Sequence, residues 1–464
     1  MDSFPDSILE LAGLLRNRAI SPVELTRDCL ARIDKLNPTL HAFITVTADS
    51  ALAQARQAET EIFRGEWRGL LHGIPIGLKD IIDTAGIPTT AASAVFKDRI
   101  PEQDAAVVSR LKAAGAVLLG KQNLHEFAYG GSSLISYFGE VHNPWNVDHI
   151  AGGSSGGSAV AVAAELCCGS IGTDTAGSIR EPSALCGVVG LKPTYGRVSA
   201  QGVIPLSTSL DHVGPIARTV ADAAAILQAI ADPEARDSSG STVPVPDYLA
   251  ALERKARDLR VGIPRSHFYE DLDPEVAAAV ERALEVIQPL VASVRESSLA
   301  AESKRELQSY EAYLYHAQFL GDCSDLYQAE TLRRILAGRD TEWSGYTRSI
   351  LELKESRRRI AAVFADVDLL ITPTVPVPAP PISAFRDHPE AQRPRELLLL
   401  RNTQPFNVWG LPAISVPCGF TGAGLPVGLQ ISGPHWGEAD VLRLAHAYEQ
   451  TNSWHRRRPR IAGE

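Results

Sequence analysis

The chain has 464 residues, 45% of them hydrophobic and 22% charged, a composition that excludes a disordered, collagen-like or coiled-coil protein. The formal net charge of −10 argues against a nucleic-acid-binding protein, which normally presents a basic face. No apolar stretch reaches the roughly 20 residues that span a membrane, and the acidic N-terminal residues are unlike a signal peptide. We therefore expect a cytoplasmic protein that does not contact a membrane.

The first part of the chain predicts helices and then strands. Apolar residues at helical spacing predict a helix over residues 7–17, and a capping box at 21–24 opens a second helix that we expect to end before Pro38. The next expected elements are a helix at 48–64, a strand at 71–84, a helix at 104–114 and a strand at 116–119.

The rest of the chain mixes short strands, helices and glycine-rich loops. A GGSSGG loop at 152–157 precedes an expected helix at 158–168, and a second glycine-rich loop covers 169–180. The later expected elements are strands at 259–264 and 366–374, mainly helices over 273–363, two strands within 411–432 and a helix at 438–450. This mixture predicts an α/β fold with a large sheet covered by helices.

Three polar residues stand in small or glycine-rich surroundings: Lys79, Ser154 and Ser178. A serine hydroxyl needs a base in order to act as a nucleophile at neutral pH. A lysine can be that base when burial lowers its pKa, and Lys79 lies among apolar residues. The loop over 175–178 has no bulky side chains, so its backbone N–H groups could meet a developing oxyanion.

The same residues also allow plainer interpretations. A lysine after a strand is most often solvated, and a GGSSGG segment is most often a flexible turn. The segment 152–156 matches the G-x-S-x-G nucleophile elbow, but the preceding residues form no buried strand, and no lysine follows as in a phosphate-binding loop. Composition and spacing therefore leave a Ser–Lys hydrolase and an ordinary loop about equally supported.

Longer blocks of sequence decide between these interpretations. They are GIPIGLKD at 73–80, GGSSGGS at 152–158, GTD at 172–174, GSIR at 177–180 and GLKPT at 190–194. In these blocks, and from about residue 20 to 450, the chain resembles the amidase signature family. The resemblance implies a single large domain, residues 1–464, with a central mixed β-sheet covered by helices on both faces.

Within that domain we expect four parts. They are N-terminal helices at 1–65, a catalytic core at 66–230, a surface connection at 231–258 and a C-terminal part with substrate-pocket helices at 259–464.

The resemblance also implies a role for each candidate site residue. Lys79 would be the base, Ser154 a bridging serine on a cis peptide after Gly153, and Ser178 the nucleophile that forms the acyl-enzyme. The oxyanion hole and substrate-binding positions would be Thr175, Ala176, Gly177, Tyr129 and Gly130. Asp174 and Arg180 would brace the nucleophile loop, and segments 129–131, 305–360 and 435–440 would line the substrate pocket.

The implied activity is cleavage of the C–N bond of a small carboxamide. We expect a small-molecule amide substrate and no cofactor, with a homodimer as one possible assembly. The histidines show no H-E-x-x-H spacing and the six cysteines include no CxxC pair, so we also expect no metal.

The family also includes the A subunit of glutamyl-tRNA(Gln)/aspartyl-tRNA(Asn) amidotransferase, which hydrolyses glutamine within a complex that binds tRNA. That subunit binds glutamine through an arginine and an acidic residue. The acidic position falls at Gly437, beside Glu438, so the glutamine-binding pair looks incomplete. On this ground the sequence favours a free-standing amidase, with the amidotransferase subunit as the alternative.

Overall fold

The computed structural model describes residues 7–234 and 242–461. They form one large domain built on an 11-stranded sheet whose strand order is β1-β3-β2-β6-β8-β7-β12-β13-β11-β9-β10. In that order the strands are Phe43–Val46, Val117–Gln122, Pro75–Lys79, Gly169–Asp174, His212–Ala217, Val189–Lys192, Ala413–Phe420, Pro426–Ser432, Leu369–Pro373, Arg260–Ile263 and Ser293–Glu296. A separate pair consists of β4 (His142–Asn143) and β5 (Asn146–Ile150).

The sheet is mixed, as predicted. Strand β2 is parallel to both β3 and β6, and β9 is parallel to β10 and β11. The strands between β6 and β11 pair antiparallel. Strands β2, β3 and β6 are buried along their whole length, which is typical of parallel strands covered on both faces.

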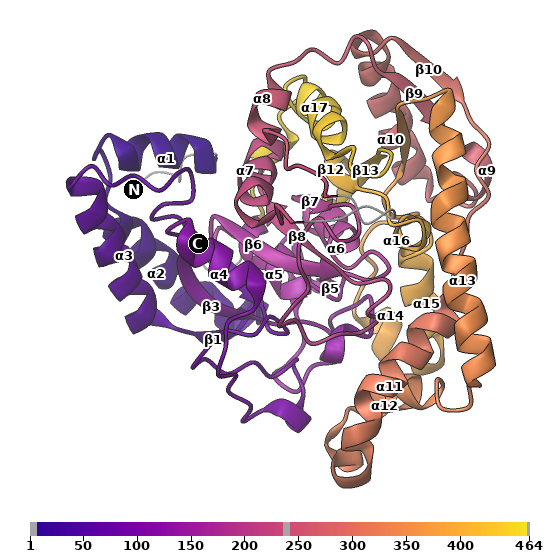
Figure 1. Cartoon of the computed structure of the whole chain (residues 1–464), viewed down its shortest axis with the longest axis horizontal. Helices are drawn as coiled ribbons and strands as arrows, with labels where there is room; N and C mark the ends of the chain where they lie inside the picture. The colour runs from indigo at the N-terminus through magenta and orange to yellow at the C-terminus, as the bar shows by residue number, and fades with distance from the viewer. Residues whose placement is uncertain (1–6, 235–241, 462–464) are drawn as a thin grey trace.

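Helices cover both faces of this sheet (Figure 1). The first nine are α1 Ile8–Arg16, α2 Pro22–Leu40, α3 Ala48–Phe63, α4 Ala106–Ala113, α5 Gly156–Ala163, α6 Arg180–Cys186, α7 Val220–Ile230, α8 Tyr248–Leu252 and α9 Arg265–Phe268. The others are α10 Pro274–Ile287, α11 Arg305–Cys323, α12 Ala329–Leu336, α13 Trp343–Arg359, α14 Ser383–Arg386, α15 Gln392–Leu399, α16 Gln404–Val408 and α17 Glu438–Glu449.

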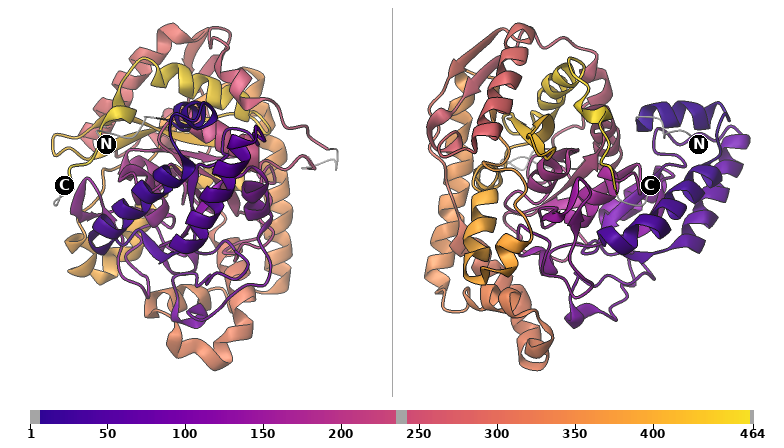
Figure 2. Two further views of the ribbon diagram at one scale, coloured as in Figure 1. Left: turned by 90° about the vertical axis from the view of Figure 1, so that its left-hand side faces the viewer. Right: turned by 180° about the vertical axis from the view of Figure 1, so that it is seen from behind.

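Alternating side chains of one strand enter two different cores. Leu118 of β3 packs in a core shared with α1, α4, α7 and α17, while its neighbours Val117 and Leu119 pack in a core shared with α2, α3 and α5. This alternation follows from the two-residue repeat of a strand. The N-terminal helices lie at one end of the molecule and α11–α13 at the opposite end (Figure 2).

Several element boundaries differ from those that we expected. Helix α2 continues through Pro38 to Leu40, because Pro38 lies in the last turn, where it removes only one helical hydrogen bond, and the buried Leu36 and Leu40 hold that turn against the core. The strand expected at 71–84 is confined to β2, and β10 interrupts the mainly helical region.

The expected surface connection at 231–258 is described only in part, since 235–241 lie outside the described residues. Residues 248–252 of it form the short helix α8, which buries Tyr248 and Ala251 against the core and leaves Ala250 exposed. Within the described ranges, the helices are too short or too polar to cross a membrane.

Candidate active site

Lys79 is the last residue of β2, and its side chain is completely buried. Its Nζ lies 2.6 Å from Oγ of Ser154 and 2.9 Å from Oγ1 of Thr173. Because β2 and β6 are parallel neighbours, their carboxyl ends meet at one edge of the sheet, which places Lys79 beside the end of β6. The two candidate residues Lys79 and Ser154 are therefore in direct contact.

Burial lowers the pKa of Lys79 to about 7, although the carboxylates of Asp211 and Asp174 act in the opposite direction. There is little free space on the face of β2 that carries Gly77 and Lys79, because a Cβ at Gly77 would collide with the side chain of Gln122. A lysine with this pKa is partly neutral at physiological pH, so it can accept a proton from a neighbouring hydroxyl.

Ser154 follows a cis peptide bond from Gly153, as the resemblance implied. Its carbonyl oxygen accepts hydrogen bonds from the N–H of His125 (3.2 Å) and from Oγ of Ser133 (3.4 Å). The N–H of Gly153 donates to Glu181 (2.7 Å). The loop is thus held on both sides of its peptide bond, which fixes the position of Ser154.

Ser178 lies between β6 and α6 and is 5% exposed. The N–H of Ser155 donates to the carbonyl oxygen of Ser178 (3.2 Å), and Oγ of Ser155 donates to the carbonyl oxygen of Thr173 (3.1 Å). These two bonds connect the GGSSGG loop to both ends of the segment 173–178, the nucleophile loop, which carries Ser178. Ser155 therefore supports the site rather than facing the cavity that Ser178 lines.

Asp174 and Arg180 form a buried ion pair that shapes the nucleophile loop. Nε and Nη2 of Arg180 each lie 2.9 Å from the carboxylate, which also accepts the N–H groups of Gly177 (2.7 Å) and Ile179 (3.2 Å). Burial acts to raise the pKa of Asp174, but Arg180 holds it far below its usual range. The charged pair therefore braces the loop that carries Ser178.

The oxyanion-hole prediction needs a correction at Gly177. Its N–H is engaged by Asp174, whereas the N–H groups of Thr175, Ala176 and Ser178 make no hydrogen bond to any described residue. Those three remain available as donors. Gly177 instead shapes the loop, because its φ of +141° suits glycine and a Cβ there would collide with the side chain of Thr403.

Two residues near the site were missed by sequence reasoning. Thr173 lies within hydrogen-bonding distance of Lys79, and Asp211 accepts a hydrogen bond from Oγ1 of Thr175 (2.5 Å). Burial raises the pKa of Asp211 to about 6. Thr173 precedes Asp174 in a recognised block, but nothing local in the sequence indicates its contact.

A small cavity of about 10 Å³, room for about one water molecule, lies beside Ser178. Five of the residues predicted for the site line it, namely Tyr129, Gly130, Thr175, Ala176 and Ser178. Arg305 and Gln308, from the segment 305–360 that was expected to line the pocket, also line it. Arg393 and Leu400 line it too and were not singled out from the sequence.

The segment expected at 435–440, with Gly437 and Glu438, is not among the residues that line this cavity. The Glu438 carboxylate accepts the backbone N–H of Thr194 (2.8 Å).

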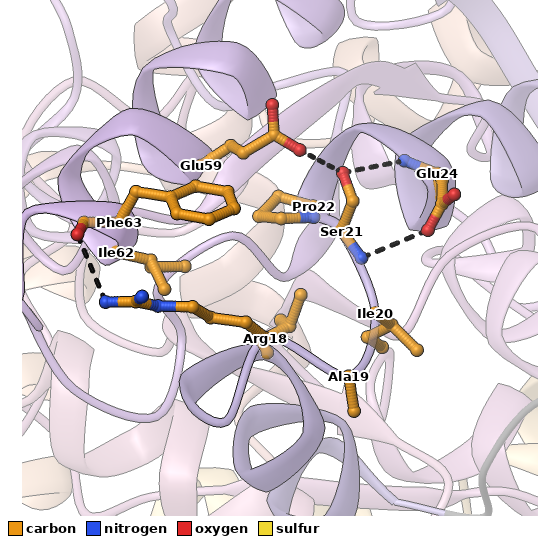
Figure 3. A pocket seen from close by; sticks show the side chains of 10 residues that line it. Arg18, Ala19, Ile20, Ser21, Pro22, Glu24, Glu59, Ile62 and Phe63 are labelled. Atoms are coloured by element: carbon orange, nitrogen blue, oxygen red, sulfur yellow. Dashed lines mark hydrogen bonds between the residues drawn. The ribbon is translucent and has the colours of Figure 1, made fainter.

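A second pocket lies far from this site, among the N-terminal helices (Figure 3). Its polar groups already have partners: Ser21 caps α2 and donates to Glu59 (2.5 Å), and Arg18 donates to the carbonyl oxygen of Phe63 (3.1 Å). The polar residues that line this pocket therefore serve in helix capping and packing. In the part of the chain that the structure describes, no group of three or more metal-binding side chains occurs.

The mixed sheet and the glycine-loop site at its edge define an α/β enzyme of the hydrolase class. The chain belongs to the amidase family, whose sequence profile, described as Amidase, matches residues 24–442.

Similar proteins include A subunits of glutamyl-tRNA(Gln) amidotransferase. The subunit of Geotalea daltonii is 43% identical, with 99% of each chain covered, and that of Myxococcus xanthus is 44% identical, with 97% of this chain and 98% of the relative covered.

Two solved structures extend this likeness. A chain of a vestigial protein complex, described as revealing the evolutionary origins of an s-triazine catabolic enzyme, is 31% identical, with a TM-score of 0.88 over 96% of this chain and 98% of that one. The peptide amidase of Stenotrophomonas maltophilia is 33% identical, with a TM-score of 0.83 over 98% of both chains. The fold and family predictions are confirmed. The curated relatives, however, favour the amidotransferase subunit over the free-standing amidase that the sequence favoured.

Proposed function

We propose that this protein hydrolyses an amide through an acyl-enzyme on Ser178, with Lys79 as the base acting through Ser154. The observation that carries the proposal is the 2.6 Å contact between a fully buried lysine amine and the Ser154 hydroxyl. A buried lysine of lowered pKa beside a serine is an established alternative to the serine–histidine pair.

In the first step, neutral Lys79 takes the proton of Ser154 while Ser154 takes the proton of Ser178. The Oγ of Ser178 then bonds to the carbonyl carbon of the amide. The N–H groups of Thr175, Ala176 and Ser178 would stabilise the oxyanion. Loss of one such donor typically lowers turnover by ~100–1000-fold.

In the second step, the C–N bond breaks as the proton held by Lys79 returns through Ser154 to the leaving amine. Water then attacks the carbonyl carbon of the acyl-enzyme and gives its proton through Ser154 to Lys79. The bond between Ser178 Oγ and that carbon breaks, the proton returns from Lys79 through Ser154 to Ser178 Oγ, and a carboxylic acid leaves. Every proton moves between groups of this chain, the substrate and water, so the cycle ends with Ser178 free.

Two substrates fit this chemistry. The curated relatives, similar over nearly the full chain, support glutamine and a role as the A subunit of a tRNA amidotransferase with partner chains. The likeness to a peptide amidase supports a free-standing hydrolase of small carboxamides, which remains the second candidate.

Ammonia release from glutamine and from simple aliphatic and aromatic carboxamides tests the proposal. A free-standing amidase releases ammonia on its own, whereas an amidotransferase subunit is nearly inert until it is combined with partner chains. In either case Ser178→Ala abolishes release. A sulfonyl fluoride should label Ser178, and labelling that persists in Ser178→Ala would remove Ser178 from the mechanism.

A further inference from the structure

Arg305, the first residue of α11, lines the cavity beside Ser178 without an anionic partner. Among the described residues its guanidinium takes part in no hydrogen bond and no ion pair. Burial, reinforced by the nearby charge of Arg393, lowers the pKa of Arg305 to about 10. A largely buried cation without a partner is unfavourable, which indicates a site for an external anion.

Arg393 of α15 adds a second positive charge to the cavity wall. Its Nη1 lies 3.6 Å from Glu396, and its guanidinium lies 5.7 Å from the centre of the Tyr129 ring. Glu396 is already engaged more closely by Arg334 (2.7 Å) and by Ser132 (2.8 Å). The charge of Arg393 is therefore only partly balanced.

No carboxylate is present among the residues that line the cavity. The nearby acids face other partners, since Glu330 pairs with both Arg333 (2.7 Å) and Arg334 (2.8 Å). The cavity next to Ser178 is therefore positive and offers no acid for a substrate ammonium group.

Gln308, one turn after Arg305, supplies a neutral polar group. Its side chain is 6% exposed and lines the cavity, yet its Oε1 has no hydrogen-bond partner. An unsatisfied buried carbonyl oxygen is unfavourable, and it can accept an N–H from a bound amide. The wall thus presents two cations and one acceptor beside Ser178.

We propose that the amide cleaved at Ser178 carries a carboxylate, which Arg305 and Arg393 bind while Gln308 accepts an N–H of the substrate. The planar guanidinium matches a carboxylate with two parallel hydrogen bonds. Since no acid lines the cavity, the preferred class is a half-amide of a dicarboxylic acid without an adjacent ammonium group. This inference rests on the proposed amide hydrolysis and supports its second candidate, a free-standing hydrolase of small carboxamides, over glutamine. The small volume requires the two long arginine side chains to move outward as substrate enters.

Three amides of matched length test the proposal. Glutaramate carries the carboxylate, and pentanamide has a methyl group in place of that carboxylate. Glutamine has the carboxylate and, on the adjacent carbon, an ammonium group. Ammonia release gives kcat/KM for each, and calorimetry on Ser178→Ala gives the equilibrium binding of each without turnover. We expect glutaramate to exceed pentanamide by about 10–100-fold, the range of a hydrogen bond to a charged group, and to exceed glutamine.

Arg305→Gln should remove most of that preference, and Arg305→Lys should retain part of it. Arg339→Gln is the matched control, because it removes the same charge from a side chain that is 60% exposed and outside the cavity. Should Arg305→Gln fail to fold by circular dichroism, Arg393→Gln and the salt dependence of wild-type glutaramate binding decide the same question.

Equal binding of glutaramate and pentanamide, or no binding of glutaramate to Ser178→Ala, overturns the proposal. An identical preference in Arg305→Gln and Arg339→Gln overturns it as well. Failure of the proposed function looks different: ammonia release would survive in Ser178→Ala, while the binding comparison would still decide whether the cavity selects a carboxylate.

Discussion

The lowered pKa of Lys79 predicts how the reactivity of Ser178 depends on pH. Only the neutral amine can accept a proton, and burial places its pKa at about 7. Reactivity should therefore rise with pH through this value and level off above about pH 8. At pH 5, two units below the pKa, about 1% of the lysine is neutral, so the rate should fall to about 1% of its plateau.

Inactivation by a sulfonyl fluoride measures this rate without knowledge of the natural substrate. The second-order rate constant, followed from pH 5 to 9 with intrinsic reagent hydrolysis subtracted, should show one acid limb of unit slope. Lys79→Met should lower the plateau by roughly 100–10,000-fold, the usual contribution of a general base, and abolish the limb.

Asp211→Asn tests the same pKa by changing the charge near Lys79 while leaving the lysine in place. The Asp211 carboxylate favours protonated Lys79, so its neutralisation should lower the lysine pKa further and move the acid limb to lower pH. A rate that stays flat between pH 5 and 8 would refute the reasoning. So would a limb that survives in Lys79→Met or moves to higher pH in Asp211→Asn.

Three further substitutions test the scaffold. Asp174→Asn leaves the Arg180 charge buried without its partner, so urea unfolding should show a loss of about 3–5 kcal/mol; a change below about 1 kcal/mol would contradict the ion-pair argument. Gly177→Ala places a Cβ against Thr403 at positive φ, so thermal stability and sulfonyl fluoride labelling should both fall, and an unchanged labelling rate would contradict this role. Ser21→Ala removes the capping box of α2 at a cost of about 1 kcal/mol, whereas Ser50→Ala, which caps no helix, should cost less in the same urea assay.

Local features of the sequence determined much of the candidate site. Glycine permits backbone conformations that other residues rarely adopt, so the glycine-rich segments at 152–157 and 169–180 predicted the loops that carry Ser154 and Ser178. The second loop is shorter than expected, because residues 169–174 form strand β6. Lys79 was recognisable because apolar residues surround it within a short strand. Element types were also predicted well where periodicity is strong, as in α1, α3, β12, β13 and α17.

The resemblance implied that segment 305–360 lines the pocket, but local reasoning could not single out the individual residues of the cavity wall. Arg305, Gln308 and Arg393 lie more than 100 residues from Ser178 along the chain and reach it only because α11 and α15 pack beside the nucleophile loop. Their spacing in the sequence is that of ordinary helix surfaces. The segment 435–440, which the resemblance implied as part of the substrate pocket, is not among the residues that line this cavity.

The sequence by itself indicated which residues carry the proposed chemistry, and the tertiary structure decided the surroundings of those residues. Backbone constraints and residue type act over a few neighbours, so they identify a nucleophile loop and a lysine on a buried strand. The pKa of Lys79, the engagement of the Gly177 N–H by Asp174 and the positive cavity depend on burial and charge summed over distant segments. Those quantities exist only once the chain has folded, because desolvation and Coulomb interactions depend on distances in space.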